Sequence, residues 1–200
     1  GCLLAELLRE DGRFEVCLSR PNKSVVLGTD NTSSLQARVD GAIAFDADYF
    51  ISLHINAYTQ DSVNGIEVFT SGRNSESYAF GNSMLLGMID STNLKNRGMK
   101  QGADLYVLKN TEIPAALLEM GFISNSADAA LLSEQPELFA QGIYDGIIDY
   151  FESAYTRDIN ILRFVIGMLI VVASILIVCD LLIAKKYNHI EEEKWKTKKI

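Results

Sequence analysis

Residues 164–184, near the C-terminus, form an apolar segment that few folds can accommodate. They read FVIGMLIVVASILIVCDLLIA, in which only Ser174 and Asp180 are polar. As an α-helix the segment is about 31 Å long at ~1.5 Å per residue, which matches the hydrocarbon core of a bilayer. The alternative, a core helix that is apolar on every side, needs a large domain around it. The sequence therefore predicts a single transmembrane helix in contact with the lipid bilayer.

The charges on either side of this segment predict its orientation. Only Arg157 and Arg163 lie close before it, whereas six lysines follow it: Lys185, Lys186, Lys194, Lys196, Lys198 and Lys199. Because an excess of Lys and Arg marks the cytoplasmic side, we expect residues 185–200 to form a basic cytoplasmic tail. We expect Asp180 to snorkel towards these lysines. The chain is thus predicted to be a single-pass protein of the cell membrane, with residues 1–155 outside the cytoplasm and residues 156–163 as a linker.

The part of the chain before the apolar segment is acidic. Residues 1–160 carry 11 Lys and Arg against 22 Asp and Glu. Nucleic acid is not an expected partner, because each phosphate contact needs a basic side chain and the basic residues here are scattered among more numerous acids. The three cysteines, Cys2, Cys17 and Cys179, form no CxxC pair, so neither a disulfide framework nor a cysteine metal site is expected.

Alternating apolar patterns over residues 1–155 predict an α/β domain with a mainly parallel sheet flanked by helices. Runs rich in β-branched, aromatic or aliphatic residues predict strands at residues 14–18, 49–54, 65–70, 105–108 and 115–120. Helical periodicity is present in the first ten residues and at residues 33–45, 75–89 and 136–151, and Asn125 or Ser126 can cap a helix at 127–132.

His54 is the candidate for imidazole chemistry in this domain. The only other histidine, His189, lies on the far side of the predicted span. His54 ends the apolar run ISLHINA, and the carboxyl ends of parallel strands line the ligand crevice of such a sheet. At that edge of the sheet His54 could bind a metal ion next to a ligand, although a histidine at a strand end more often has a structural role.

Glu119 ends a second apolar run, PAALLEMGFISN, where an unpaired carboxylate is costly to bury. It can serve as a general base whose pKa is raised by apolar neighbours, or as the partner of an ion pair with Arg97. Arg97 is the first residue of the loop RGMKQG. Its guanidinium can form two parallel hydrogen bonds with a substrate carboxylate, or it can remain solvated. Glu67 and Asp48 are further acidic candidates, which strand-end capping and surface ion pairs explain equally well.

Taken together, the segments FEVCLSR, ADYFISLHINA, GIEVF and NRGMKQGADLYVLKNTEIPAALLEMGFISN, with the amphipathic helix that follows, resemble the zinc-dependent N-acetylmuramoyl-L-alanine amidases. The resemblance extends in order from about Leu3 to Phe151. It implies a twisted, mainly parallel sheet. It also implies that His54 is a zinc ligand, that Glu119 is catalytic, and that Arg97 holds the peptide.

The activity implied by the resemblance is hydrolysis of the amide bond between N-acetylmuramic acid and L-alanine in peptidoglycan. Zinc would lower the pKa of its bound water to about 7, and Glu119 would take the proton of that water. The partners would be the stem peptide and the glycan.

The chain departs from the family at its zinc site. The family binds zinc through two histidines and a glutamate, and the first histidine and the glutamate precede the helix with which this chain begins. A catalytic zinc needs three protein ligands. We therefore expect this chain to be an N-terminally truncated fragment that is inactive alone, and the start at Gly1 without a signal sequence favours that interpretation. The alternative is a degenerate domain without metal.

Two other functions fit the same residues. One is a non-catalytic, membrane-anchored module that binds peptidoglycan or regulates its cleavage. The other is a zinc carboxypeptidase that releases terminal amino acids from peptides. The chemical identity of the reaction product separates these hypotheses from the amidase.

Overall fold

The computed structural model describes residues 1–22, 24–72 and 75–196. The chain divides into two compact units, Gly1–Phe151 and Glu152–Ile200. The first unit contains a four-stranded sheet in the order β1-β4-β2-β3. The strands are β1 (Phe50–Asn56), β2 (Ile66–Thr70), β3 (Asn96–Gln101) and β4 (Ala115–Phe122).

The sheet is mixed. β1 is parallel to β4 and β2 is parallel to β3, but β2 runs antiparallel to β4. The α/β class and the helix-flanked, mainly parallel sheet predicted from the sequence are therefore confirmed, with one antiparallel pairing at the centre of the sheet. β4 lies between β1 and β2, so residues distant in the sequence become neighbours there.

Alternation along the strands gives the sheet two different faces. One face bears Ile66, Val68, Ala116 and Leu118, which belong to the larger hydrophobic core. The other face bears Ala115 and Leu117, which form a smaller cluster with Val39, Val107 and Leu108, against which Phe50 and Phe69 pack. β1, β2 and β4 therefore contribute to both cores, as strands covered on both sides do.

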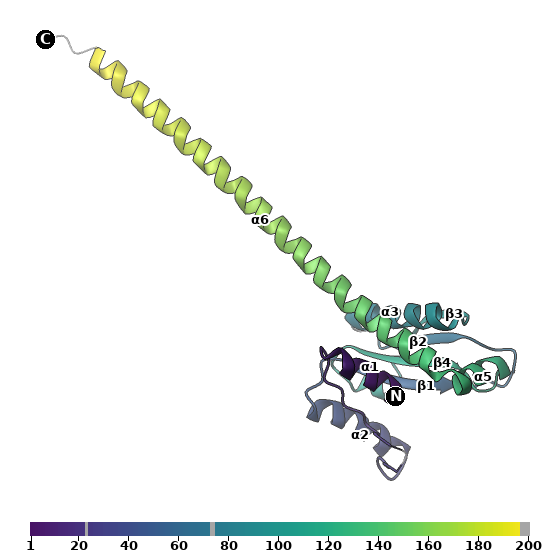
Figure 1. The fold of residues 1–200 in the computed structure, drawn as a ribbon. Coiled ribbons are helices and arrows are strands. Elements are labelled where there is room, and N and C mark those ends of the chain that lie inside the picture. Colours follow the sequence, from purple (N-terminus) through teal and green to yellow (C-terminus); the bar gives the residue numbers. More distant parts are fainter. Residues whose placement is uncertain (23, 73–74, 197–200) are drawn as a thin grey trace. The chain divides into compact units, whose positions relative to one another are not determined.

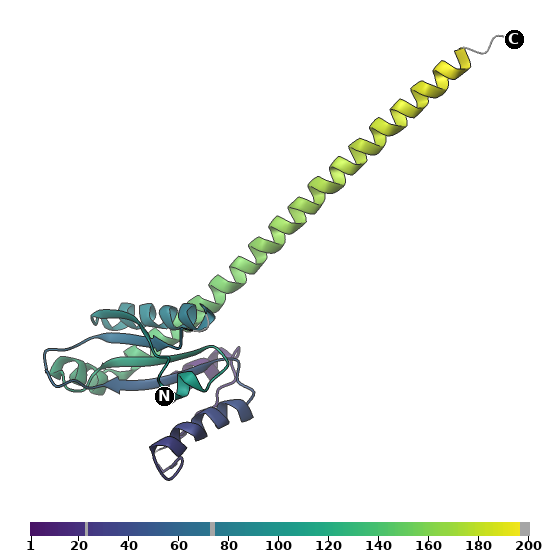
Figure 2. The same ribbon diagram turned by 180° about the vertical axis from the view of Figure 1, so that it is seen from behind.

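Helices cover both faces. On the larger core lie α1 (Cys2–Asp11), α3 (Ser75–Thr92), α5 (Ser126–Glu134) and the first turns of α6 (Pro136–Lys196). The smaller cluster is covered by α2 (Asn31–Ala44) and α4 (Tyr106–Lys109). Figures 1 and 2 show α2 and α3 on opposite sides of the sheet.

Local sequence explains where these helices begin and how closely two of them pack. α2 begins with a capping box between Asp30 and Ser33, and the side chain of Asn125 caps α5. α3 and the first turns of α6 cross at glycines, where a Cβ atom added to Gly87 would lie 2.1 Å from the carbonyl oxygen of Gly142. Only glycine permits that approach, which brings α6 close to the larger core.

Two predicted strands are wrong. Residues 14–18 do not form a strand, although Phe14 and Val16 pack against the larger core. Residues 105–108 lie mostly in the short helix α4, where Val107 and Leu108 are buried. The sequence analysis also missed β3, whose residues NRGMKQ lack the apolar pattern of the other strands.

Within the second unit, residues 152–196 belong to helix α6, which continues without interruption through the predicted linker at residues 156–163 and the apolar segment at 164–184. The large apolar side chains of that segment are exposed. Among the described residues, α6 is the one helix long and apolar enough to cross a membrane by length and composition. Lys198 and Lys199 of the predicted tail lie outside the described residues.

Candidate active site

Strand register brings the two main candidates together. His54 on β1 pairs with Glu119 on the parallel strand β4, and Glu119 pairs with Glu67 on the antiparallel strand β2. Residues directly paired across a sheet project from the same face and have Cβ atoms about 5 Å apart. His54, Glu119 and Glu67 therefore form one row on the face that carries the smaller cluster. We call this row the acid–histidine row.

Glu119 is the member of the row whose environment is most unusual. Its Oε2 atom is buried and has no hydrogen-bond partner among the described residues. Burial, with a further contribution from the negative charge of Glu67, raises the pKa of Glu119 from 4.5 to about 7. A carboxyl group with such a pKa exchanges a proton readily near neutral pH, as a general base must.

In Glu67, by contrast, both carboxylate oxygens accept hydrogen bonds. Nε of Arg97 donates a hydrogen bond to Oε2 of Glu67 over 3.0 Å, and Nδ2 of Asn56 donates to Oε1 over 3.0 Å. The guanidinium of Arg97 also lies 4.9 Å from the centre of the Phe122 ring. Arg97 thus forms its ion pair with Glu67, and the alternative ion pair with Glu119 does not form.

His54 lies at the outer side of the row, because β1 pairs only with β4 in the described sheet. Its Nε2 lies 3.0 Å from Oγ of Ser52. Partial burial and the positive charge of Arg38 lower the pKa of His54 below its usual value. The lowered pKa favours the neutral imidazole, which is the form that binds a metal ion. Asp48 precedes β1 and lies at the opposite end of that strand, so it does not join the row.

Two further residues near the row were missed by the sequence analysis. Asn56 follows His54 by two positions, and its place in the same polar strand end was a usable signal. Arg38 lies on α2, and its Nε is buried without a hydrogen-bond partner among the described residues. Nothing in the sequence distinguishes Arg38 from a solvated arginine on a helix.

The described residues do not by themselves fit a zinc ion. Within residues 1–22, 24–72 and 75–196, no group of three His, Cys, Asp or Glu side chains is placed to hold a metal. His54 offers one nitrogen ligand, whereas catalytic zinc takes three protein ligands. Glu119 is free to act as a base rather than as a ligand.

The raised pKa of Glu119 predicts how stability depends on pH in the metal-free protein. The folded state holds a proton on Glu119 that the unfolded state releases at about pH 4.5. The contribution of this group to stability is therefore complete below about pH 4.5 and is lost as the pH rises through about 7. We expect Glu119→Gln to raise the free energy of unfolding at pH 8 by about 1 kcal/mol, after allowance for solvent screening, and to change it little at pH 4. Denaturant unfolding at the two pH values measures this, and an equal effect at both would contradict it.

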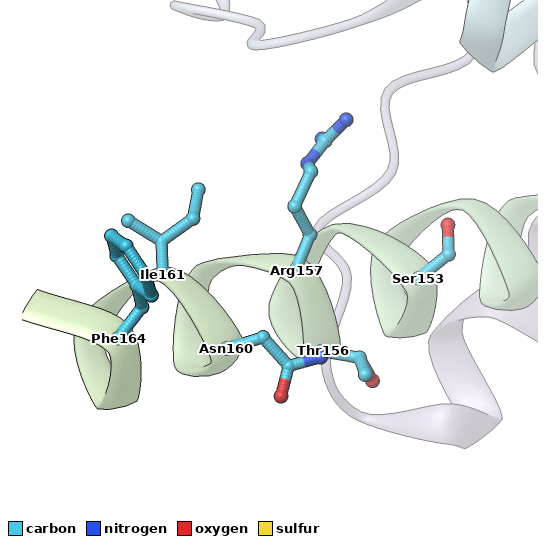
Figure 3. Close-up of a pocket in the computed structure, with 6 residues that line it drawn as sticks. All are labelled: Ser153, Thr156, Arg157, Asn160, Ile161 and Phe164. Atoms are coloured by element: carbon cyan, nitrogen blue, oxygen red, sulfur yellow. The ribbon is translucent and has the colours of Figure 1, made fainter. Parts of the chain in front are cut away.

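A separate surface hollow lies on helix α6 in the second unit. Figure 3 shows its six lining side chains, which are Ser153, Thr156, Arg157, Asn160, Ile161 and Phe164. All six come from one helix, and none is a carboxylate or an imidazole. The hollow therefore lacks the groups that the acid–histidine row provides.

Comparison with known proteins gives a consistent result. Residues 2–149 match the family model described as N-acetylmuramoyl-L-alanine amidase. The N-acetylmuramoyl-L-alanine amidase LytC of Bacillus subtilis is 33% identical over 126 residues, which cover 61% of this chain and 25% of that protein. The chain spans between 25% and 61% of the length of the first three curated relatives it matches.

Solved structures show the same similarity. The catalytic domain of CwlV, an N-acetylmuramoyl-L-alanine amidase from Bacillus (Paenibacillus) polymyxa var. colistinus, matches with a TM-score of 0.65 and 32% identity, covering 75% of this chain and 79% of that one. The CwlD amidase from Clostridioides difficile, solved in complex with the GerS lipoprotein, matches with a TM-score of 0.69 and 28% identity, covering 76% and 82%.

Proposed function

The chain belongs to the N-acetylmuramoyl-L-alanine amidase family, and from that premise we propose that it hydrolyses the amide bond between N-acetylmuramic acid and L-alanine in peptidoglycan. The observation that carries the proposal is the carboxyl group of Glu119 beside His54, whose Oε2 is buried without a hydrogen-bond partner among the described residues and whose pKa is raised to about 7. Such a group can take a proton from water and return it within one reaction.

Glu119 performs the proton transfers in this proposal. As the oxygen of a water molecule attacks the carbonyl carbon of the lactyl amide, Glu119 accepts a proton from that water. It then donates the proton to the amide nitrogen, which leaves as the free amine of L-alanine. The products are a lactyl carboxylate on the sugar and a free amino terminus on the stem peptide.

The other members of the row support Glu119. Burial is the main cause of the raised pKa of Glu119, and Glu67, which is held close by Arg97 and Asn56, raises it further. Arg97 is fixed by the same ion pair. Arg97 also donates a hydrogen bond to the carbonyl oxygen of Asn64 and lies over the ring of Phe122, and in this proposal it holds the stem peptide.

Zinc dependence is part of the proposal, with His54 as the described residue that would serve as a ligand. Its low pKa favours the neutral imidazole that metals bind. A catalytic zinc would require two ligands in addition to His54, which the described residues do not supply.

We further propose that the apolar segment at residues 164–184 anchors the protein in the cell membrane, with the first unit on the outer side and the basic tail in the cytoplasm. Its length, its exposed apolar side chains and the lysines that follow it support this topology. The unit that carries Glu119 would then face the cell wall, where peptidoglycan is located.

Product analysis tests the proposed activity. We expect the detergent-solubilised protein that carries a complete zinc site, incubated with purified muropeptides and zinc, to release stem peptides that begin at L-alanine and sugars with a free lactyl carboxylate. Mass spectrometry identifies both. Release of a terminal amino acid instead would indicate a carboxypeptidase. Binding of peptidoglycan without any release would favour the non-catalytic module, the alternative that the incomplete zinc site supports.

A further inference from the structure

Asp128, in the first turn of α5, is a buried acidic residue that the proposed reaction does not use. Its side chain lies in the interior, with a relative exposure of 1%. Neither ion pair found in the described part of the chain includes it. Its Oδ2 atom instead accepts hydrogen bonds from two backbone N–H groups, that of Gly65 over 2.8 Å and that of Phe122 over 3.0 Å. A carboxyl group is costly to bury unless it is hydrogen-bonded, so these two contacts account for its place in the interior.

The two N–H groups belong to chain segments next to the acid–histidine row. The antiparallel pairing of β2 with β4 stops at Glu67 and Glu119, which are its last partners. Gly65 lies two residues before Glu67. Phe122 lies three residues after Glu119. The carboxyl group of Asp128 therefore joins β2 and β4 just beyond the point where their own hydrogen-bond ladder ends.

Two glycines make this contact possible. Gly65 has a φ of +102° and Gly121 has a φ of +153°, which are backbone conformations that other residues rarely adopt. A Cβ atom added to Gly65 would lie 2.3 Å from the carbonyl oxygen of Lys95. A Cβ atom added to Gly121 would lie 3.4 Å from Oδ2 of Asp128. The backbone on both strands is therefore shaped to fit closely around the carboxyl group.

Residues 124–128 also hold the loop that connects β1 to β2. Oγ of Ser124 accepts a hydrogen bond from the backbone N–H of Tyr58 over 3.0 Å. Nδ2 of Asn125 donates a hydrogen bond to the carbonyl oxygen of Asp61 over 2.7 Å. Together with the bonds of the buried carboxyl group, these contacts fasten the loop after β1, the start of β2 and the end of β4 to one segment.

We propose that Asp128 is a positioning residue for the reaction, which fixes Glu119 relative to Glu67 while Glu119 takes and returns the proton. The inference rests on the proposed function and deepens it, because Asp128 acts through Glu119 and does not touch the substrate. A ladder that ends at the general base leaves β4 unsupported on the β2 side, and Asp128 supplies that support. Precise support matters, since a displacement of about 1 Å can lower a rate about 10²-fold.

Steady-state hydrolysis of muropeptides tests this role in the detergent-solubilised protein that carries a complete zinc site. We expect Asp128→Ala to lower kcat by a factor of about 10 to 100 and to leave KM within a factor of about two, since a displaced base slows proton transfer without altering substrate binding. Asp128→Asn should lower kcat by a factor of about 3 to 10. Its amide keeps one acceptor oxygen but brings N–H donors to a place that is lined by N–H donors.

Hydrogen exchange at two backbone amides tests the contact itself and requires no activity. NMR of the full chain in detergent micelles measures exchange at Gly65 and Phe122, whose N–H groups both bond to Asp128. We expect Asp128→Ala to speed exchange at both amides by a factor of about 10 or more, because the acceptor that protects them is lost. Exchange at the buried amides of α3 should change little.

Two control variants separate positioning from stability. Glu134→Gln removes an exposed carboxylate from the same helix and should leave kcat and KM unchanged. Ile143→Ala leaves a cavity in the larger core, which lies on the other face of the sheet from the row. It should lower the thermal unfolding midpoint, as Asp128→Ala does, but kcat measured well below that midpoint should stay normal. A merely structural role for Asp128 predicts the same behaviour for both alanine variants.

Several outcomes would overturn the positioning role. One is a kcat within a factor of about two of the wild type in both Asp128 variants, and Asp128→Asn alone decides this if Asp128→Ala does not fold. Another is a fall in kcat/KM that comes from KM alone, which would assign Asp128 to substrate binding. Unchanged exchange at Gly65 and Phe122 would also reject it. A wild-type protein that releases neither product rejects the proposed function itself, which is seen before any variant is compared.

Discussion

Replacing Glu119 by Gln is expected to lower the rate of muropeptide hydrolysis by a factor of about 10²–10⁴. The amide keeps the shape of the side chain but cannot accept the proton of the attacking water. The loss should appear in kcat more than in KM, because the proton moves only as the transition state forms. Quantification of the released stem peptide measures both constants.

The control for this variant is Glu112→Gln, which removes an exposed carboxylate shortly before the same strand. It should hydrolyse muropeptides at the normal rate. Turnover by Glu119→Gln within a few-fold of the wild type would reject Glu119 as the general base. The pH profile gives an independent check, since activity should rise as the pH rises through about 7 and the carboxyl group loses its proton.

Replacing His54 by Ala is expected to remove most of the zinc from the protein that carries a complete site. Loss of one of three protein ligands leaves too few to hold the ion in competition with water. Elemental analysis of the purified protein measures zinc per chain. Glu119→Gln should keep its zinc, because it changes the base and not a ligand.

His189→Ala is the matched control, since His189 is the other histidine of the chain and lies on α6 in the second unit. It should leave the zinc content unchanged. Equal zinc in wild type and His54→Ala would reject His54 as a ligand. A wild-type protein that copurifies with no zinc and gains no activity from added zinc would reject the metal dependence itself.

The sequence predicted the strands that carry an unambiguous apolar pattern. β1, β2 and β4 are aliphatic runs bounded by turn residues, and each was found within two residues of its ends. β3 was missed because NRGMKQ is mostly polar and contains Gly98 with φ of +82°, so it shows neither alternation nor β-propensity. It becomes a strand through its parallel pairing with β2, a tertiary effect that a local pattern does not contain.

The two strands that were predicted wrongly, at residues 14–18 and 105–108, also reflect tertiary packing that a local pattern does not contain. A run of four apolar residues, such as 105–108, fits a buried strand or one buried helical turn equally well. The structure resolves the ambiguity through packing, since Val107 and Leu108 fill the space between α2 and β4 from the helix α4. Residues 14–18 contact the larger core without pairing along the sheet, which periodicity alone does not reveal.

The sequence indicated which residues of the candidate site carry chemistry, but it did not indicate which residues they contact. His54 and Glu119 each end an apolar run, and in the structure they are directly paired across β1 and β4. The choice between Glu67 and Glu119 as the partner of Arg97 depends on β2 lying antiparallel beside β4, which no local pattern indicates. The lone Nε of Arg38 likewise depends on how α2 packs.

The central place of β4 has a consequence for how the acid–histidine row is assembled during folding. β1 and β2 are made first but do not pair with each other, and both must wait for residues 115–122. Their backbone edges stay open until that segment inserts between them and closes two long loops, which is a slow step for a chain. The acid–histidine row is completed in the same step. The nascent protein therefore lacks a complete row, and stays vulnerable to aggregation, until β4, the last of the described strands, is in place.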